Sequence, residues 1–272
     1  MEKLLREGAV DCDLLKCPEW ENIVSAARPL RPVYVHFEIV AGNGGFDHLD
    51  FDLIRTMLAS TQTPHLNCHL MGRPDLDPSS PADQRKLVKS WVSEMQYLKE
   101  QVPGVKLVAE NLPYIPESYG NAIGSSPEII KQAIVEADAG LLLDLSHARI
   151  SCHYLGMDLE DYVARLPMDR LSELHITGLR YYCGYLNDHF EMHPEDWEAA
   201  EWARAQIRAG AWREPEIAAF EYGGVGDCFA DFIRGDFEDP GAPDGPDQEE
   251  DGLGDDKQDD RAGQQVEDRA VR

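Results

Sequence analysis

The amino-acid sequence predicts an α/β barrel, in which parallel strands alternate with helices around one closed sheet. Two observations favour this fold. Six short apolar runs have the pattern of buried strands, and most are separated by segments with helical periodicity. The chain has 272 residues and 43% hydrophobic content, which suits a single barrel with one large core. We therefore expect a TIM-type (β/α) barrel.

Each of the six runs ends on a residue that can bind a metal ion. The runs are Val33–His36, His65–His69, Val105–Glu110, Leu141–Asp144, Leu171–His175 and Ile217–Glu221. In barrels of this type the chemistry lies at the carboxyl ends of the strands. Because His, Asp and Glu account for only 60 of the 272 residues, six such endings in succession indicate a metal-binding rim.

A further strand is expected before these six, at Val10–Leu15. The run that begins at Val33 should continue to Ile39, and the glycines within residues 41–45 indicate a loop after it. The resulting set of strands is one fewer than the eight of a complete barrel. Either one strand of the usual barrel is missing, or another element completes the wall.

The helices follow from periodicity and from the residues at their ends. Pro18 lies near the start of the first, Ser125 or Ser126 can cap the fourth, and Pro167 ends the fifth. The helices are expected at residues 19–27, 50–60, 81–101, 127–136, 159–166 and 194–209. The third carries an apolar stripe that includes Trp91, and this stripe should belong to the core.

Composition places the chain among cytoplasmic proteins. No apolar stretch approaches the roughly 18 residues that a membrane span requires. The first fifteen residues lack the apolar core of a signal peptide. The six cysteines show no C-x-x-C spacing, which is typical of reduced thiols rather than of a disulfide framework. We expect a cytoplasmic location and no membrane partner.

The formal net charge of −26 is unevenly distributed. Residues 236–272 contain 14 acidic and 4 basic residues and almost no aliphatic ones, which predicts a disordered acidic tail. Residues 1–235 should form the barrel domain, which is itself acidic. Such a surface repels phosphate backbones, so we expect no nucleic-acid partner.

Further candidate ligands follow the strand ends. His147 lies three residues after Asp144 and is expected in a loop, and Asp188 and His189 lie in a polar segment that also has the composition of a loop. Nine residues are expected to converge on metal ions: His36, His69, Glu110, Asp144, His147, His175, Asp188, His189 and Glu221. Buried charges in that number would repel one another unless cations held them together.

Within this set, Glu110, Asp144 and Glu221 are the candidate catalytic residues. Three residues near the rim are candidate substrate contacts: Asn111, Arg149 and Arg180. Either arginine could equally be a surface charge.

The order of the ligand residues resembles that of the xylose-isomerase-like superfamily of TIM barrels. Residues 140–178 are most similar to the multinuclear non-heme iron-dependent oxidative enzymes, the family of the methanobactin and thiaglutamate maturation enzymes. The segments 35–42 and 68–70 resemble its two early histidine-bearing strands. The ligand order, with Asp144 and His147 as a D-x-x-H pair, is also similar to that of endonuclease IV, which has a trinuclear zinc site.

The chain departs from these patterns at three places. The iron family usually has asparagines where this chain has Ser146 and His147. Asp188 and His189 are adjacent, whereas both families commonly leave a residue between the paired ligands. An acidic tail stands where a final helix is expected. These departures weaken the inference of a particular reaction from the resemblance more than they weaken the inference of a metal site.

The resemblance implies two or three divalent metal ions, with iron favoured over zinc or manganese. Mixed imidazole and carboxylate ligands suit iron with open positions for oxygen and substrate. The implied activity is oxidative modification of a thiol- or cysteine-containing peptide or small molecule, and a partner protein could present the peptide.

Two alternatives remain open at this stage. A mononuclear sugar isomerase or epimerase would use only the tetrad Glu110, Asp144, His175 and Glu221, and would leave four histidines unexplained. An endonuclease IV-like zinc phosphodiesterase would need a basic cleft, which a chain with 25 basic and 51 acidic residues does not favour.

Truncation of the chain after Gly235 is expected to leave fold and metal content unchanged, because the composition of residues 236–272 cannot support burial. Circular dichroism and elemental analysis of the truncated and full-length proteins would check this. Aggregation or loss of metal on truncation would show that the tail completes the barrel.

Overall fold

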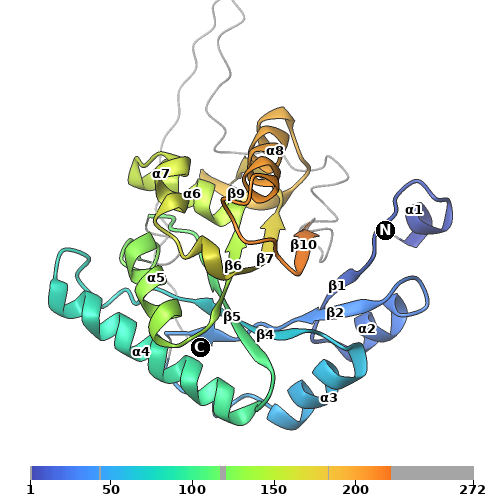
Figure 1. Cartoon of the computed structure of the whole chain (residues 1–272), viewed down its shortest axis with the longest axis horizontal. Coiled ribbons are helices and arrows are strands. Elements are labelled where there is room, and N and C mark those ends of the chain that lie inside the picture. The colour runs from blue at the N-terminus through green and yellow to red at the C-terminus, as the bar shows by residue number, and fades with distance from the viewer. Residues whose placement is uncertain (1, 43, 117–120, 183, 222–272) are drawn as a thin grey trace, which may run out of the picture.

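A curved wall of parallel strands forms the centre of the fold, with helices around its outer side (Figure 1). The computed structural model describes residues 2–42, 44–116, 121–182 and 184–221. The expected boundary at residue 235 and the acidic tail lie outside these residues. None of the helices in the described part of the chain is long and apolar enough to span a membrane.

Seven strand positions make up the wall. Six strands pair in the order β10-β7-β6-β5-β4-β3, and β1 pairs with β2, all in parallel. The strands are β1 (Leu15–Pro18), β2 (Val33–His36), β3 (Val40–Ala41), β4 (His65–Leu70), β5 (Lys106–Asn111), β6 (Gly140–Asp144), β7 (Leu171–Ile176) and β10 (Ile217–Phe220). The segments β2 and β3 occupy one position, because the N–H of His69 also bonds the carbonyl of Ile39 between them, at 2.8 Å.

No strand ladder joins β1 to β10 within the described residues. Side chains connect β10 to β1 and to β2 instead. Lys16 on β1 forms an ion pair with Glu221 at the end of β10, and Tyr34 on β2 packs with Ile217 and Ala219 on β10. The predicted number of strands is found, and the part of the wall built by the described residues is one strand short of eight.

The six predicted helices are present, and two of them have the predicted bounds. The helices are α1 (Glu2–Arg6), α2 (Glu21–Ala27), α3 (Phe51–Thr61), α4 (Pro81–Gln101), α5 (Pro127–Glu136), α6 (Leu145–Leu155), α7 (Leu159–Ala164) and α8 (Pro194–Arg208). Asp50 caps α3 by accepting hydrogen bonds from two backbone N–H groups, and Ser80 caps α4 by accepting from the backbone N–H of Asp83. Helices α1 and α6 were not expected.

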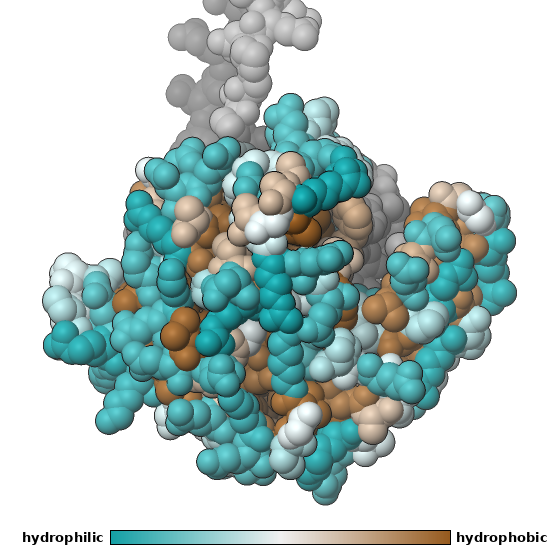
Figure 2. Space-filling model, viewed as in Figure 1, coloured by the Kyte–Doolittle hydropathy of each residue, from teal (hydrophilic) through white to brown (hydrophobic). Residues whose placement is uncertain are grey.

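The core lies between the strand wall and the helices. The predicted stripe on α4 is fully buried, from Leu87 through Trp91 and Met95 to Leu98. Burial of side chains of this size contributes roughly 1.5 to 3 kcal/mol each. The indole N–H of Trp91 donates to the carbonyl of Met71 at 3.0 Å and so fixes the loop after β4. Figure 2 shows hydrophilic residues over most of one outer face.

Three sequence-based expectations about local structure were wrong. The first strand is Leu15–Pro18, because its ladder with β2 starts at Leu15, while Val10 and Leu14 remain exposed. His147 lies in the first turn of α6 instead of a loop. Asp188 and His189 lie on strand β9 (Tyr185–Phe190), which pairs antiparallel with β8 (Gly178–Tyr182).

Asp196 fastens this hairpin and α8 to the barrel. Its side chain is buried at the start of α8 and accepts from Arg149 on α6 at 2.7 Å and from Arg180 on β8 at 3.2 Å. It also accepts from the backbone N–H of His193 at 2.9 Å, which completes a capping box. Three elements therefore meet on one carboxylate.

Replacement of Asp196 by alanine should destabilise the metal-free protein, because it leaves two guanidinium groups without their partner. We expect a loss of about 3 kcal/mol, at the lower end for a buried ion pair, since both arginines keep some contact with water. Urea unfolding followed by circular dichroism measures this. Glu195→Ala, an exposed change in the same helical turn, is the control; equal losses in the two variants would contradict the anchoring role.

Candidate metal centre

The nine predicted ligand residues meet at the carboxyl ends of the barrel strands. Their potential ligand atoms fall into groups whose members all lie within 4.8 Å of one another. Three of these groups together contain all nine residues: His36, His69 and Glu110; Glu110, Asp144, His175 and Glu221; and His147, Asp188 and His189.

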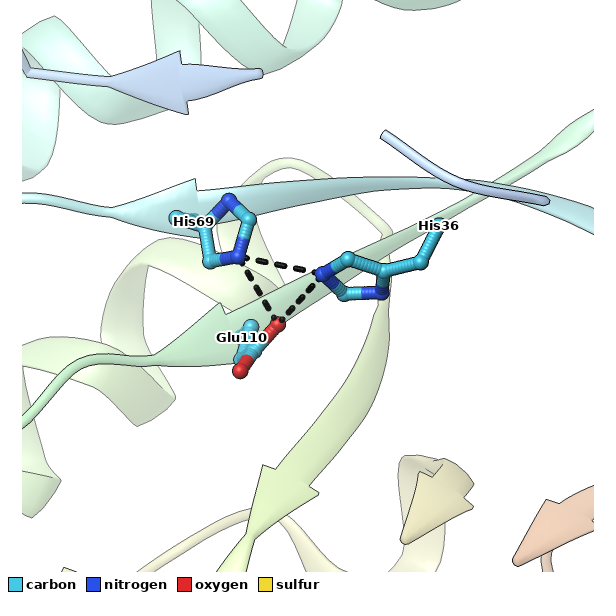
Figure 3. Close-up of side chains that lie close together, drawn as sticks. All are labelled: His36, His69 and Glu110. Carbon is cyan, nitrogen blue, oxygen red and sulfur yellow. Dashed lines mark hydrogen bonds and ion pairs between the residues drawn. The ribbon is translucent and has the colours of Figure 1, made fainter. Parts of the chain in front are cut away.

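The first group contains one histidine from each of β2 and β4 and a carboxylate from β5 (Figure 3). The Nε2 atoms of His36 and His69 are 3.2 Å apart, and they lie 3.5 and 3.2 Å from Oε2 of Glu110. Nitrogen ligands about 2.0–2.1 Å from an ion lie roughly 3.0–3.4 Å from one another. The triangle therefore has the dimensions of three ligands around one cation.

The second group centres on Nδ1 of His175. This atom lies 3.2 Å from Oε1 of Glu221, 3.8 Å from Oε1 of Glu110 and 3.9 Å from Oδ2 of Asp144. Glu110 thus presents Oε2 to the first group and Oε1 to the second. A carboxylate in this position can bridge two cations.

The third group lies beside the barrel wall, on α6 and β9. His147 Nε2 is 2.8 Å from Oδ2 of Asp188, and Oδ1 of Asp188 is 3.7 Å from Nε2 of His189. Neighbouring side chains on a strand ordinarily point to opposite faces. His189 has φ of 67°, in the left-handed region, and this backbone turn brings its ring to the same side as Asp188. Adjacent ligands are possible here for that reason.

Hydrogen bonds to backbone carbonyls orient three of the imidazoles. His69 donates from Nδ1 to the carbonyl of Ile39 at 3.1 Å, His147 to that of Asn111 at 2.8 Å, and His189 to that of Glu221 at 3.2 Å. A carbonyl oxygen can only accept, so each Nδ1 carries a proton and each Nε2 faces the cluster.

The D-x-x-H spacing has a local structural cause. Asp144 is the N-cap of α6, and its Oδ1 accepts from the backbone N–H of His147 at 2.7 Å. The cap places the imidazole in the first turn of the helix, against the strand end that carries the carboxylate. Oδ2 of Asp144 stays directed at the cluster.

Several buried polar atoms of this cluster lack a hydrogen-bond partner among the described residues. They are His36 Nδ1, Glu110 Oε2, Asp144 Oδ2, His175 Nδ1 and Asp188 Oδ2. A buried polar atom left without a partner costs about 1–3 kcal/mol. Four of these five atoms face the ligand groups, where a cation would satisfy them, so the donor set fits bound metal.

Electrostatics within the cluster favour positive charge. Burial raises the pKa of Asp144, and the nearby Asp188 and Glu110 raise it further. Burial alone would lower the pKa of His147, but Asp144, Asp188 and Glu110 raise it to about 10. The surplus carboxylates thus hold a proton on the imidazole, and a metal ion would take the place of that proton.

Two charged residues beside the cluster were missed by the sequence analysis. Lys16 pairs with Glu221, and burial lowers the pKa of its ammonium group, although Glu110 and Glu173 oppose the shift. Glu173 is buried and accepts from Nε2 of His175 at 2.7 Å. The sequence held a signal for both residues, because each is a charged residue inside a short apolar strand. For Glu173 there was a second signal, because it lies two residues before a ligand histidine and therefore on the same face of the strand.

The three expected substrate contacts are engaged elsewhere. The Asn111 side chain donates to the carbonyl of Asp144 and accepts from its backbone N–H, both at 2.9 Å, so it ties β5 to β6. Arg149 and Arg180 pair with Asp196. None of the three is among the described residues that line the cavity over the cluster. The structure therefore does not support substrate contact by Asn111, Arg149 or Arg180.

That cavity has a volume of about 360 Å³. Seven of the nine candidate ligands line it, and Asp144 and His175 lie beneath them. One part of the wall is apolar and consists of Val40, Leu112, Pro113 and Ile115, and the remaining lining residues are Glu38 and Asn187. A small group carried by a larger molecule could therefore reach the cluster along an apolar wall.

Comparison with known proteins identifies a related family. Residues 52–210 match the family described as RiPP precursor modification enzyme MbnB/TglH/ChrH. A UPF0276 protein of Acaryochloris marina is 26% identical over 159 residues, which are 56% of each chain. A UPF0276 protein of Alcanivorax borkumensis is 29% identical over 149 residues, which are 50% of this chain and 48% of the relative. The chain thus spans about half the length of these curated relatives.

Two solved structures share the fold of this chain. A D-psicose 3-epimerase, crystallised in the presence of D-fructose, gives a TM-score of 0.52 at 13% identity, over 86% of this chain and 82% of the other. A xylose isomerase-like TIM barrel/4-hydroxyphenylpyruvate dioxygenase fusion protein gives 0.50 at 14% identity, over 84% and 38%. These likenesses show the fold, and they confirm the predicted TIM-type barrel.

We expect protein purified without oxygen to hold more than one equivalent of transition metal. Glu110→Ala should remove most of it, since Glu110 belongs to two groups, whereas Asp188→Ala should remove no more than one equivalent. Elemental analysis measures both, with Glu216→Gln, outside the cluster, as control. One equivalent or less in the unaltered protein, unchanged by His36→Ala and His69→Ala, would contradict the multinuclear site.

Proposed function

Because the chain belongs to the MbnB/TglH/ChrH family of RiPP precursor modification enzymes, we propose that it is a multinuclear, iron-dependent oxidative enzyme acting on a cysteine-containing peptide. One observation carries the proposal. The ligand atoms form three groups joined through shared or adjacent carboxylates, which is more than a mononuclear centre uses. Imidazole and carboxylate in this mixture suit ferrous iron.

The proposed centre holds two or three divalent ions. The first group would hold one ion and the second another, with Glu110 between them, and the third group would hold a further ion. Iron in this setting supplies one-electron chemistry with oxygen and a position for a substrate thiolate. Zinc or manganese would also fit these donors, so the choice of iron rests on the family.

The protein's own groups would orient the substrate. Glu110 and Glu221 line the cavity. Glu110 directs both oxygens at the ligand groups, so Glu221 is the carboxylate that can take up the proton of a thiol as the thiolate forms. Asp144 lies beneath them and serves as a ligand and helix cap. The apolar wall of Val40, Leu112, Pro113 and Ile115 would contact the side chains next to the cysteine and keep water from the reacting carbon.

A peptide substrate agrees with the family, whose members modify peptide precursors. Presentation of the peptide by a partner protein and a cytoplasmic location are parts of the same proposal. A nucleic-acid substrate is disfavoured by the net charge of −26. An endonuclease IV-like zinc phosphodiesterase, which the order of the ligand residues resembles, is therefore the least supported of the three functions.

A second candidate function is sugar epimerisation at a single divalent ion. The tetrad of Glu110, Asp144, His175 and Glu221 is present as one group within 4.8 Å, and the fold is shared with a D-psicose 3-epimerase. This reading assigns no role to His36, His69, His147 and His189. We rank it below the oxidase for that reason.

We expect oxygen consumption that requires both ferrous iron and a cysteine-containing peptide. Asp144→Asn and Glu221→Gln should lower the rate at least about a hundredfold, as for loss of an essential ligand, and Glu216→Gln should retain it. An oxygen electrode and mass spectrometry of the peptide measure the reaction. Nicking of abasic DNA by zinc-loaded protein, abolished in the same two variants, would overturn the proposal, as would epimerisation of a ketose by protein with one equivalent of metal.

A further inference from the structure

A buried carboxylate lies one layer below the metal centre. Glu173 is on β7, two residues before His175 and on the same face, and its side chain is 1% exposed. Its Oε1 accepts from Nε2 of His175 at 2.7 Å and from the hydroxyl of Tyr34 at 2.9 Å. Its Oε2 accepts from Nε2 of His65 at 2.5 Å. Strands β2, β4 and β7 therefore converge on one side chain.

Glu173 also forms a possible ligand group with His36 and His175, but its hydrogen bonds make it a supporting residue instead of a ligand. Both of its oxygens are occupied by donors, and all three donor side chains are buried. Tyr34 and His65 approach from the neighbouring strand positions of β2 and β4. Together they hold the carboxylate in one orientation, so that it meets the imidazole of His175 from below.

His175 differs from the other oriented histidines of the cluster. His69, His147 and His189 each donate from Nδ1 to a backbone carbonyl and present Nε2 to the ligand groups. His175 presents Nδ1, which is buried, lacks a hydrogen-bond partner among the described residues and lies 3.2 Å from Oε1 of Glu221. Its Nε2 points into the barrel, toward Glu173.

We propose that Glu173 is a positioning residue that keeps the proton of His175 on Nε2 and thereby makes Nδ1 the metal-binding atom. A carboxylate that accepts from one ring nitrogen fixes both the tautomer and the ring orientation. Without this acceptor, the proton of His175 is free to move to Nδ1, where it would block the second ligand group. The inference rests on the metal centre proposed above but not on its oxidative reaction.

The proton position can be read directly by NMR of protein labelled with ¹⁵N in histidine, both metal-free and loaded with zinc. We expect His175 to carry its proton on Nε2 in both states, whereas His69 and His147 carry theirs on Nδ1 when zinc is bound. His175→Gln assigns the signals. A proton on Nδ1 of His175 with none on Nε2, in either state, would overturn the proposal.

Zinc affinity supplies the second readout. Glu173→Met keeps the size of the side chain but removes both acceptors, and it should weaken zinc binding at one position by about 10- to 100-fold. Glu173→Gln keeps one acceptor oxygen and should restore most of the affinity. Glu216→Gln is the matched control, because it neutralises a carboxylate outside the cluster that pairs with Lys106. This variant should bind zinc as tightly as the unaltered protein does.

The outcomes separate this inference from the metal centre itself. Lower thermal stability in Glu173→Met with unchanged zinc affinity would show a purely structural role and overturn the inference. Failure of the unaltered protein to bind zinc would overturn the metal centre. The metal-free spectrum would still report where the proton of His175 lies.

Discussion

The carboxylate of Glu110 is the group on which the rest of the site depends. It is 1% exposed, at the end of β5, in the middle of the hydrogen-bonded sheet. Burial would favour its neutral form, but His69, His175 and His36 hold its pKa well below the usual range. A buried anion needs positive charge close by. The imidazoles that surround Glu110 supply part of this positive charge. Cations bound between them would supply the rest.

The barrel fold tolerates such a cluster of charges, because its parallel strands end together at one rim. The ligands on β4, β5, β6 and β7 lie in register, with His69 beside Glu110 and Asp144 beside His175. Each strand is short and apolar up to its last residues, so the charges are confined to one end. The apolar core beneath, including the α4 stripe, then holds that end rigid.

Much of this arrangement could be predicted from the sequence, since apolar runs and their terminal residues are local patterns. The runs ending at His69, Glu110 and His175 became strands with those residues at the rim. Helix α6 escaped prediction because it starts directly on Asp144, without a separate loop. Hairpin β8–β9 escaped because its second strand is polar, with Asp188 and His189 in the third ligand group and Asn187 on the cavity wall. The charge of Glu173 inside an apolar strand was a usable signal, but its contact with Tyr34 could not be predicted, since Tyr34 lies 139 residues away in the chain.

The third ligand group differs from the other two in where it is built. The first two stand on barrel strands, whereas Asp188 and His189 belong to a hairpin inserted between β7 and α8 and held by Asp196. Surface connections of this kind change in length between homologous proteins more readily than core strands do. If each ligand group holds one ion, as proposed, the number of bound metals depends on this hairpin. Gain or loss of the hairpin during evolution would then change the number of metals from three to two, or the reverse, while the barrel core stays the same.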